Sequence, residues 1–179
     1  MNVLTILRKW AAYNEEVNQD LARILGPLAT GESPRWEAPV GSFFKNLKGL
    51  LNHLINSDLA WLRRFSENGL ASAELKPLLE GLPETGYGKN LFDTWGDYLD
   101  LRNRLDQAWK VFAQHVPEAR LDENFTYTNF QGKSVTAPWI GLIFHLLNHQ
   151  THHRGAISQI LDSWGIENDY SGMTRVWML

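Results

Sequence analysis

Four of the six histidines lie within nine residues of one another: His145, His149, His152 and His153. His149 and His153 are four residues apart, so on a helix their imidazoles lie on one face about one turn apart, a spacing that one metal ion can bridge. His145 extends this row, but its separation from His153 is roughly 12 Å along a helix, so one ion cannot bind all three rings. His152 points about 100° away from His153 around the helix and cannot join the pair.

A third ligand must come from another helix, and His53 is the natural choice. The neighbours on its helix face are mostly small or polar, as in the wall of a cavity: Asn46, Gly49, Leu50, Asn56 and Ser57. The competing interpretation is that these histidines are hydrogen-bonded core residues. Three imidazoles leave a coordination position for water or substrate, which is the arrangement of a catalytic metal site. Imidazole suits Zn and Ni, the metals we expect, and also Fe.

A divalent ion at such a site supports two kinds of chemistry. It can lower the pKa of its water to about 7, which gives hydroxide near neutrality. It can also deprotonate and hold a thiol. Because the chain contains no cysteine, that thiol would have to arrive as a low-molecular-weight cosubstrate.

The acid/base partner is not visible in the sequence, so the catalytic residues stay unknown. Asp58 follows His53 by five residues, about 140° around a helix, and should point away from the ligand face. If the first helix faces the last, we expect Tyr13, Asn14, Gln150 and Arg154 to line the opening of the site. Arg154 could bind an anionic cosubstrate, or it could form a surface or dimer-interface salt bridge.

The elements that must position these residues are four amphipathic helices, each with apolar residues at alternating spacings of three and four. The expected helices run from Leu4 to Leu25, ended by Gly26-Pro27; from Phe43 to Phe65, with Ser42 as N-cap; from Leu91 to Val116; and from Pro138 to Trp164. A long Gly- and Pro-containing connection covers 68–89. The sequence therefore predicts an all-α up-down four-helix bundle, a single domain over 1–179.

Between Asn124 and Thr136 the apolar period changes to two, and Gln131-Gly132 offers a turn, which predicts a short β-hairpin between the third and fourth helices. Asn14 and Asn18 interrupt the apolar stripe of the first helix. They either pair across helices and fix the register of the bundle or line a polar pocket. Arg102 interrupts the third stripe, so it should pair with a carboxylate or extend outward.

Composition excludes several classes of function. Lys and Arg total 17 and Asp and Glu total 20, so the net charge is −3. A chain without an excess of basic residues is not expected to bind nucleic acid or an anionic membrane. The absence of cysteine excludes disulfides, Cys-type zinc sites and a catalytic thiol supplied by the chain. The N-terminus is charged within eight residues, unlike a signal peptide, and the longest apolar stretch is too short to span a bilayer. We therefore expect a cytoplasmic protein.

Several separated pieces of sequence point to one family. They are Tyr13-Asn14 with Asn18, LNHLINSDLAWL from Leu51, the hairpin FTYTNFQGKSVTAPW, and HLLNHQTHHRGAISQIL from His145. In this order they resemble the DinB-like superfamily of four-helix bundles with a three-histidine metal site. The resemblance implies metal ligands at His53, His149 and His153, and a homodimer. It also implies either a thiol-dependent transferase or isomerase or a protein with no assigned activity.

Two functional hypotheses follow. The first is a metal-dependent enzyme acting on a small molecule, either a thiol transferase or isomerase or a hydrolase that uses metal-bound water. The second is a non-catalytic, dimeric metal-binding module related to stress, in which the bundle binds a small ligand.

Overall fold

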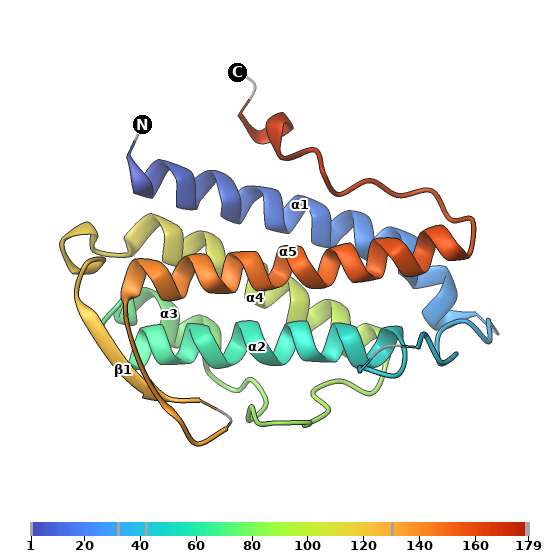
Figure 1. Ribbon diagram of the computed structural model, residues 1–179, viewed down its shortest axis with the longest axis horizontal. Helices are drawn as coiled ribbons and strands as arrows, with labels where there is room; N and C mark the ends of the chain where they lie inside the picture. Colours follow the sequence, from blue (N-terminus) through green and yellow to red (C-terminus); the bar gives the residue numbers. More distant parts are fainter. Residues whose placement is uncertain (1, 32, 42, 130, 178–179) are drawn as a thin grey trace.

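The computed structural model describes residues 2–31, 33–41, 43–129 and 131–177, and these are mostly helical (Figure 1). The helices are α1 (Val3–Thr30), α2 (Leu47–Glu67), α3 (Ser72–Leu79), α4 (Trp95–His115) and α5 (Trp139–Ser163), with short 3-10 helices at Glu118–Arg120 and Met173–Val176. Strands β1 (Asn124–Thr128) and β2 (Ser134–Pro138) form an antiparallel hairpin before α5. The predicted all-α fold with this hairpin is confirmed. Within the described residues, no helix is long and apolar enough to cross a membrane.

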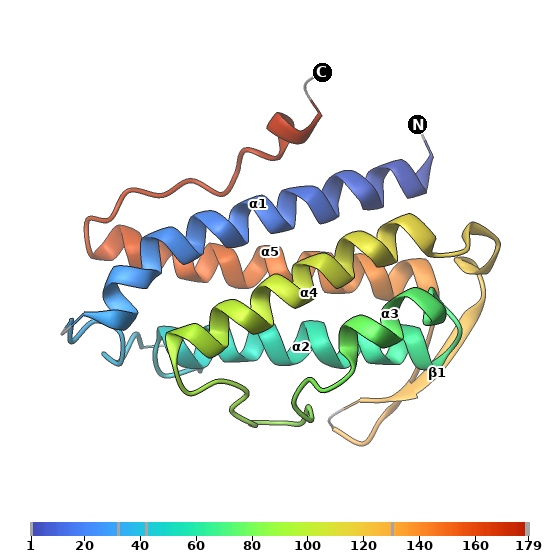
Figure 2. The same cartoon turned by 180° about the vertical axis from the view of Figure 1, so that it is seen from behind.

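The helix directions differ from a simple up-down order, because α2 and α4 run the same way (Figures 1 and 2). Asp58 of α2 bonds Arg102 of α4, and further along both helices Phe65 stacks on Phe112. The connection between α2 and α4 returns along the bundle, and it contains the additional helix α3, which buries Leu75 and Leu79. Eight residues are too few for the apolar period of α3 to stand out among the surrounding glycines and prolines.

The first two helices have boundaries other than those predicted. Helix α1 continues past Gly26-Pro27 to Thr30 and bends near this end (Figure 1), because proline removes only its own N–H while its carbonyl still accepts a bond from Gly31. Helix α2 begins at Leu47 rather than near Phe43. Its N-cap is Asn46, whose side chain accepts from Gly49 N at 2.9 Å. The expected cap, Ser42, lies outside the described residues.

The third predicted helix begins later in the structure than predicted, whereas the last one lies close to its predicted bounds. Helix α4 begins at Trp95, after Leu91, where Thr94 and Asp97 form a capping box. Helix α5 follows β2 directly and ends before Gly165, close to the prediction. The first N–H groups of α5, at Trp139 and Ile140, donate to carbonyls of the segment before β1 at 3.1 and 2.9 Å. The hairpin thereby fixes the start of the helix that carries the histidine cluster.

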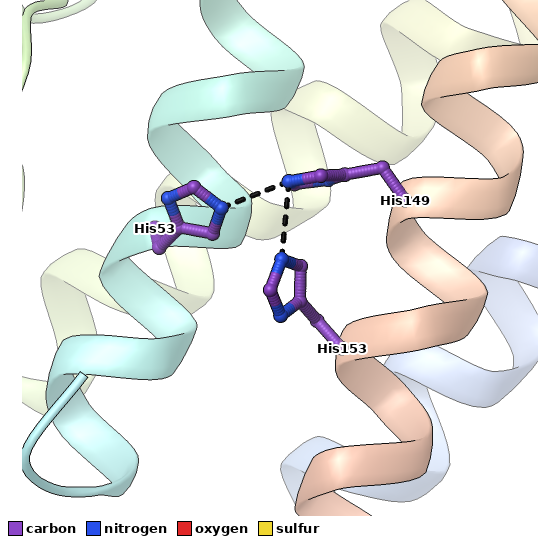
Figure 3. Close-up of side chains that lie close together, drawn as sticks. All are labelled: His53, His149 and His153. Carbon is purple, nitrogen blue, oxygen red and sulfur yellow. Dashed lines mark hydrogen bonds between the residues drawn. The ribbon is translucent and has the colours of Figure 1, made fainter. Parts of the chain in front are cut away.

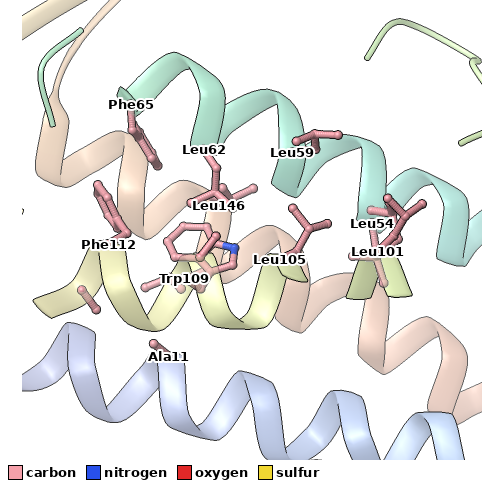
Figure 4. Close-up of a cluster of buried hydrophobic side chains, with 14 of the residues drawn as sticks. Ala11, Leu54, Leu59, Leu62, Phe65, Leu101, Leu105, Trp109, Phe112 and Leu146 are labelled. Atoms are coloured by element: carbon pink, nitrogen blue, oxygen red, sulfur yellow. The ribbon is translucent and has the colours of Figure 1, made fainter. Parts of the chain in front are cut away.

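The hydrophobic core lies where the inner faces of α1, α2, α4 and α5 meet (Figure 4). Phe65 of α2 stacks on Phe112 of α4 with ring centroids 4.8 Å apart, and Trp109 packs edge-on against both rings. Leucines such as Leu59 and Leu105, both fully buried, fill the space along the two helices. Burying each of these large side chains contributes about 1.5–3 kcal/mol. This packing holds α2 and α4 at a fixed separation.

The asparagines of α1 pair across helices, as the register interpretation predicts. Asn14 donates to Gln150 of α5, and Asn18 donates to Asp106 of α4 at 2.8 Å. Both are buried among apolar residues, where an unpaired amide would be costly. Of the two alternatives predicted for Arg102, the structure shows pairing with a carboxylate, that of Asp58.

Candidate metal centre

The three histidines predicted from spacing and resemblance lie together between α2 and α5 (Figure 3). Nε2 of His149 lies 2.8 Å from Nε2 of His53 and 3.1 Å from Nε2 of His153. One ring nitrogen from each residue falls within 4.8 Å of the other two. The i, i+4 pair on α5 supplies two rings from one face, and antiparallel α2 brings the third ring opposite them.

Hydrogen bonding alone cannot satisfy this arrangement. A ring nitrogen carries either one proton or one lone pair, so Nε2 of His149 can complete only one of its two contacts as a hydrogen bond. A metal ion between the rings would accept the lone pairs of all three. Nitrogens bound 2.0–2.1 Å from a tetrahedral zinc lie about 3.3 Å apart, close to the two distances from Nε2 of His149. The donor set therefore fits a divalent transition metal.

The environment keeps the three rings neutral, as metal ligands must be. Burial first, and then the charges of the neighbouring His153 and His53, lower the pKa of His149 to about 3. Burial, followed by the charge of His53, lowers the pKa of His153 to about 4. Burial also lowers the pKa of His53, although the negative charge of Asp58 opposes this shift. At neutral pH all three lone pairs are therefore available.

Phe44 packs against the triad and was missed by sequence reasoning, which assigned it to a helix. Its ring centroid lies 4.5 Å from that of His53 and 5.1 Å, edge-on, from that of His153. The segment carrying Phe44 approaches α2 at Gly49, where a Cβ would lie 2.3 Å from the Phe44 carbonyl oxygen. Lys45, the next residue, has a φ of 66°, which a helix does not allow. The glycine inside the apolar stripe of α2 was the available signal.

A cavity of about 560 Å³ opens beside His53, a size typical of small-molecule sites. Its walls are formed by the segment before α2, the exposed side of α2 and the loop after α3. The lining residues are Phe43, Phe44, Lys45, Gly49, Asn52, His53, Asn56, Ser57, Tyr87, Gly88 and Lys89. No carboxylate occurs among these described residues.

The four residues predicted to line the opening are all buried, and none of them borders this cavity. Asn14 donates to Gln150, which in turn donates to Asp58 at 2.5 Å. The guanidinium of Arg154 is buried and lies over the ring of Tyr13, 5.5 Å from its centroid, so Arg154 is not placed for a salt bridge on the exposed surface of the described residues. A role of these four toward a ligand stays a prediction.

The other two clustered histidines lie at the edge of the triad. His145 lies near Trp61, with ring centroids 6.5 Å apart, and its centroid is 6.4 Å from that of His149. His152 is exposed, and its ring lies edge-on to that of His153 with centroids 4.9 Å apart. Neither belongs to the group of converging nitrogens found in the described residues.

Comparison with known proteins agrees with the resemblance seen in the sequence. A sequence model of the DinB family matches residues 1–170. The chain belongs to the DinB family. It is 28% identical over 153 residues to Protein DinB of Bacillus subtilis (strain 168), which covers 86% of this chain and 83% of that protein. No solved structure matches the chain.

In this DinB-family chain a buried charged cluster lies behind the triad. Sequence reasoning named Asp58, Arg102 and Gln150 without their connection and missed Asp106. Asp58, fully buried, accepts bonds from Gln150 and from Arg102, the latter at 2.7 Å, so it points inward as its position on α2 predicts. Arg102 also pairs with Asp106 at 3.0 Å. Burial raises the pKa of Asp106 to about 6 although the charge of Arg102 opposes the shift. The cluster links α2 to α4 and α5 next to the residues that present His53 and His149.

Proposed function

We propose that this DinB-family protein binds one divalent transition-metal ion through His53, His149 and His153 and acts on a small molecule as a metal-dependent enzyme. The observation that carries the proposal is the convergence of three neutral imidazole nitrogens beside an open cavity. Zn and Ni are the metals that we expect, and Fe is compatible with the same ligands. Tyr13, Asn14, Gln150 and Arg154 are retained as candidate residues around the ligand.

The protein's own residues supply the positioning of the reaction. The three histidines leave a coordination position open, and Phe44 shields His53 and His153 from water on one side. His53 alone of the three borders the cavity, so substrate would approach from the α2 side. The ion, when bound, would lower the pKa of a coordinated water or thiol.

The site is compatible with both the thiol-dependent reaction and hydrolysis. A bound ion would lower the pKa of a coordinated water as well as that of a thiol, and no described lining residue carries a carboxylate that could act as a further general base. Because the chain has no cysteine, we expect a low-molecular-weight thiol to bind as a cosubstrate.

Metal analysis of protein purified without added metal, followed by thiol-consumption assays, tests the proposal. Protein loaded with Zn or Ni would be incubated with glutathione, cysteine or coenzyme A and a panel of electrophiles. We expect thiol consumption that disappears in His149→Ala and persists in His152→Ala. Metal-loaded wild-type protein that catalyses neither thiol consumption nor ester hydrolysis would contradict the enzyme and favour the non-catalytic, stress-related module. Homodimer formation and a cytoplasmic location also stay predictions, to be tested by light scattering and cell fractionation.

A further inference from the structure

The cavity beside the triad has an unbalanced positive charge. Its lining contains Lys45 and Lys89, both exposed, and no Asp or Glu among the described residues. A divalent ion held by three neutral histidines would add two further positive charges without any compensating protein ligand. Asp58, the carboxylate that acts electrostatically on His53, is fully buried and bonded to Arg102 and Gln150. A negatively charged ligand would supply the missing charge.

The loop carrying Lys89 is held in place by two asparagines one turn apart on α2. Asn52 donates to the Lys89 carbonyl at 2.6 Å and accepts from Leu91 N at 2.7 Å. Asn56 likewise donates to the Gly86 carbonyl at 2.6 Å and accepts from Gly86 N at 3.2 Å. Each amide thus uses both its groups on the loop backbone. The position of Lys89 at the cavity is fixed before any ligand binds.

The opposite wall, with Lys45, is fixed in a similar way. The Lys45 carbonyl accepts from Val40 N at 2.8 Å, and the close approach at Gly49 holds the preceding residue against α2. The positive φ of Lys45 is a strained conformation of the kind that clusters at ligand sites. The two lysines are therefore mounted on backbone segments held against the same helix.

Two aromatic rings complete the site. Among the described residues, the large hydrophobic side chains that are exposed are Phe43, at 78%, and Tyr87, at 76%, and both line this cavity. Exposed aromatic surface concentrated in one concave site indicates ligand binding rather than a random surface position. Phe43 is on the same segment as Lys45, and Tyr87 is on the same loop as Lys89, so each lysine-bearing segment supplies one ring.

We infer that the cavity binds an organic anion with a flat apolar body, such as an aryl carboxylate, whose charge is neutralised by Lys45 and Lys89. The body of the ligand contacts Phe43 and Tyr87. Because this inference names the substrate class of the metal-bearing site, it rests on the proposed function. The ordering of both walls before binding reduces the entropy cost of the complex.

Paired probes that differ only in charge test the inference. Calorimetric or ligand-observed NMR titrations of 2-naphthoate and the neutral 2-naphthalenemethanol would be made with zinc-loaded and with metal-free protein. We expect naphthoate to bind about tenfold more tightly than the alcohol. Exposed charge pairs contribute less than about 1 kcal/mol, so Lys45→Met and Lys89→Met should each weaken naphthoate binding about threefold, which corresponds to about 0.65 kcal/mol.

The double variant should lose the preference for the anion in the metal-free protein and should weaken it in the zinc-loaded protein, where the charge of the ion remains, while binding the alcohol as wild type does. Lys133→Met, which removes a lysine that does not line the cavity, should leave both affinities unchanged. Equal affinities of wild-type protein for the two probes, or an unchanged preference in the double variant, would overturn the inference. Zinc affinity is measured separately on the same samples, so failure of the metal site and failure of anion selection are different results.

Discussion

Replacing Asp58 with asparagine removes the negative charge from the buried cluster while leaving the size of the side chain unchanged. Asp58 is fully buried, and its two oxygens accept bonds from Arg102 at 2.7 Å and Gln150 at 2.5 Å. Removing one partner of a buried ion pair typically costs about 3–5 kcal/mol, because the other charge stays desolvated. Arg102 keeps Asp106 at 3.0 Å, so we expect the lower end, about 3 kcal/mol. For a chain of this size that corresponds to a fall in Tm of about 6–12 °C.

Urea and thermal unfolding of the metal-free protein provide the measurement. The control is Asp100→Asn, a substitution at an exposed position of α4, which should change the free energy of unfolding by less than about 0.5 kcal/mol. Adding Arg102→Met to Asp58→Asn should cost less than the sum of the two single changes, because both break the same pair. A loss below about 1 kcal/mol for Asp58→Asn, or fully additive effects, would refute the role assigned to this cluster.

Two further outcomes follow from the surroundings of the triad. In Gly49→Ala, the new Cβ would lie 2.3 Å from the Phe44 carbonyl oxygen, so the segment carrying Phe44 must move away from His53. We expect the free energy of unfolding, measured in urea, to fall by about 1–3 kcal/mol, and zinc binding to weaken. An unchanged zinc affinity would count against this account. Because the pKa values of His149 and His153 are about 3 and about 4, well below the usual 6.5, the unfolded chain binds more protons than the folded chain below pH 6.5. The free energy of unfolding of the metal-free protein should therefore fall as the pH drops from 6.5 toward 4, less steeply in His149→Asn, and parallel pH profiles of the urea midpoint would contradict the assignment.

The structural features that depend only on local spacing in the sequence were predicted correctly. The His149–His153 pair depends only on the helical period, which tertiary contacts leave unchanged. The hairpin was visible as a change of period to two, ending at a turn containing Gly132. The position of His53 opposite the pair needed one further element, an antiparallel α2, which the resemblance to the DinB-like superfamily supplied.

Features that depend on contacts between distant segments were not predicted. The start of α2 depends on Asn46 as a cap and on the left-handed Lys45, and the alternation of apolar residues continues through both. The direction of α4 depends on the course of the connection from α2, which has no periodic signal. The link between Asp58 and Arg102 joins residues 44 positions apart, so their pairing appears only when the helices are placed side by side.

Zinc and nickel titrations of metal-free protein by calorimetry test the metal centre most directly. Loss of groups that only support a ligand typically costs about 10–100-fold in metal affinity, so His149→Ala, which removes a ligand itself, should cost more than about a hundredfold. His152→Ala, three residues further along the same helix and exposed, should bind metal as wild type does. Equal affinities of these two variants would contradict the metal centre and leave the histidines as structural residues.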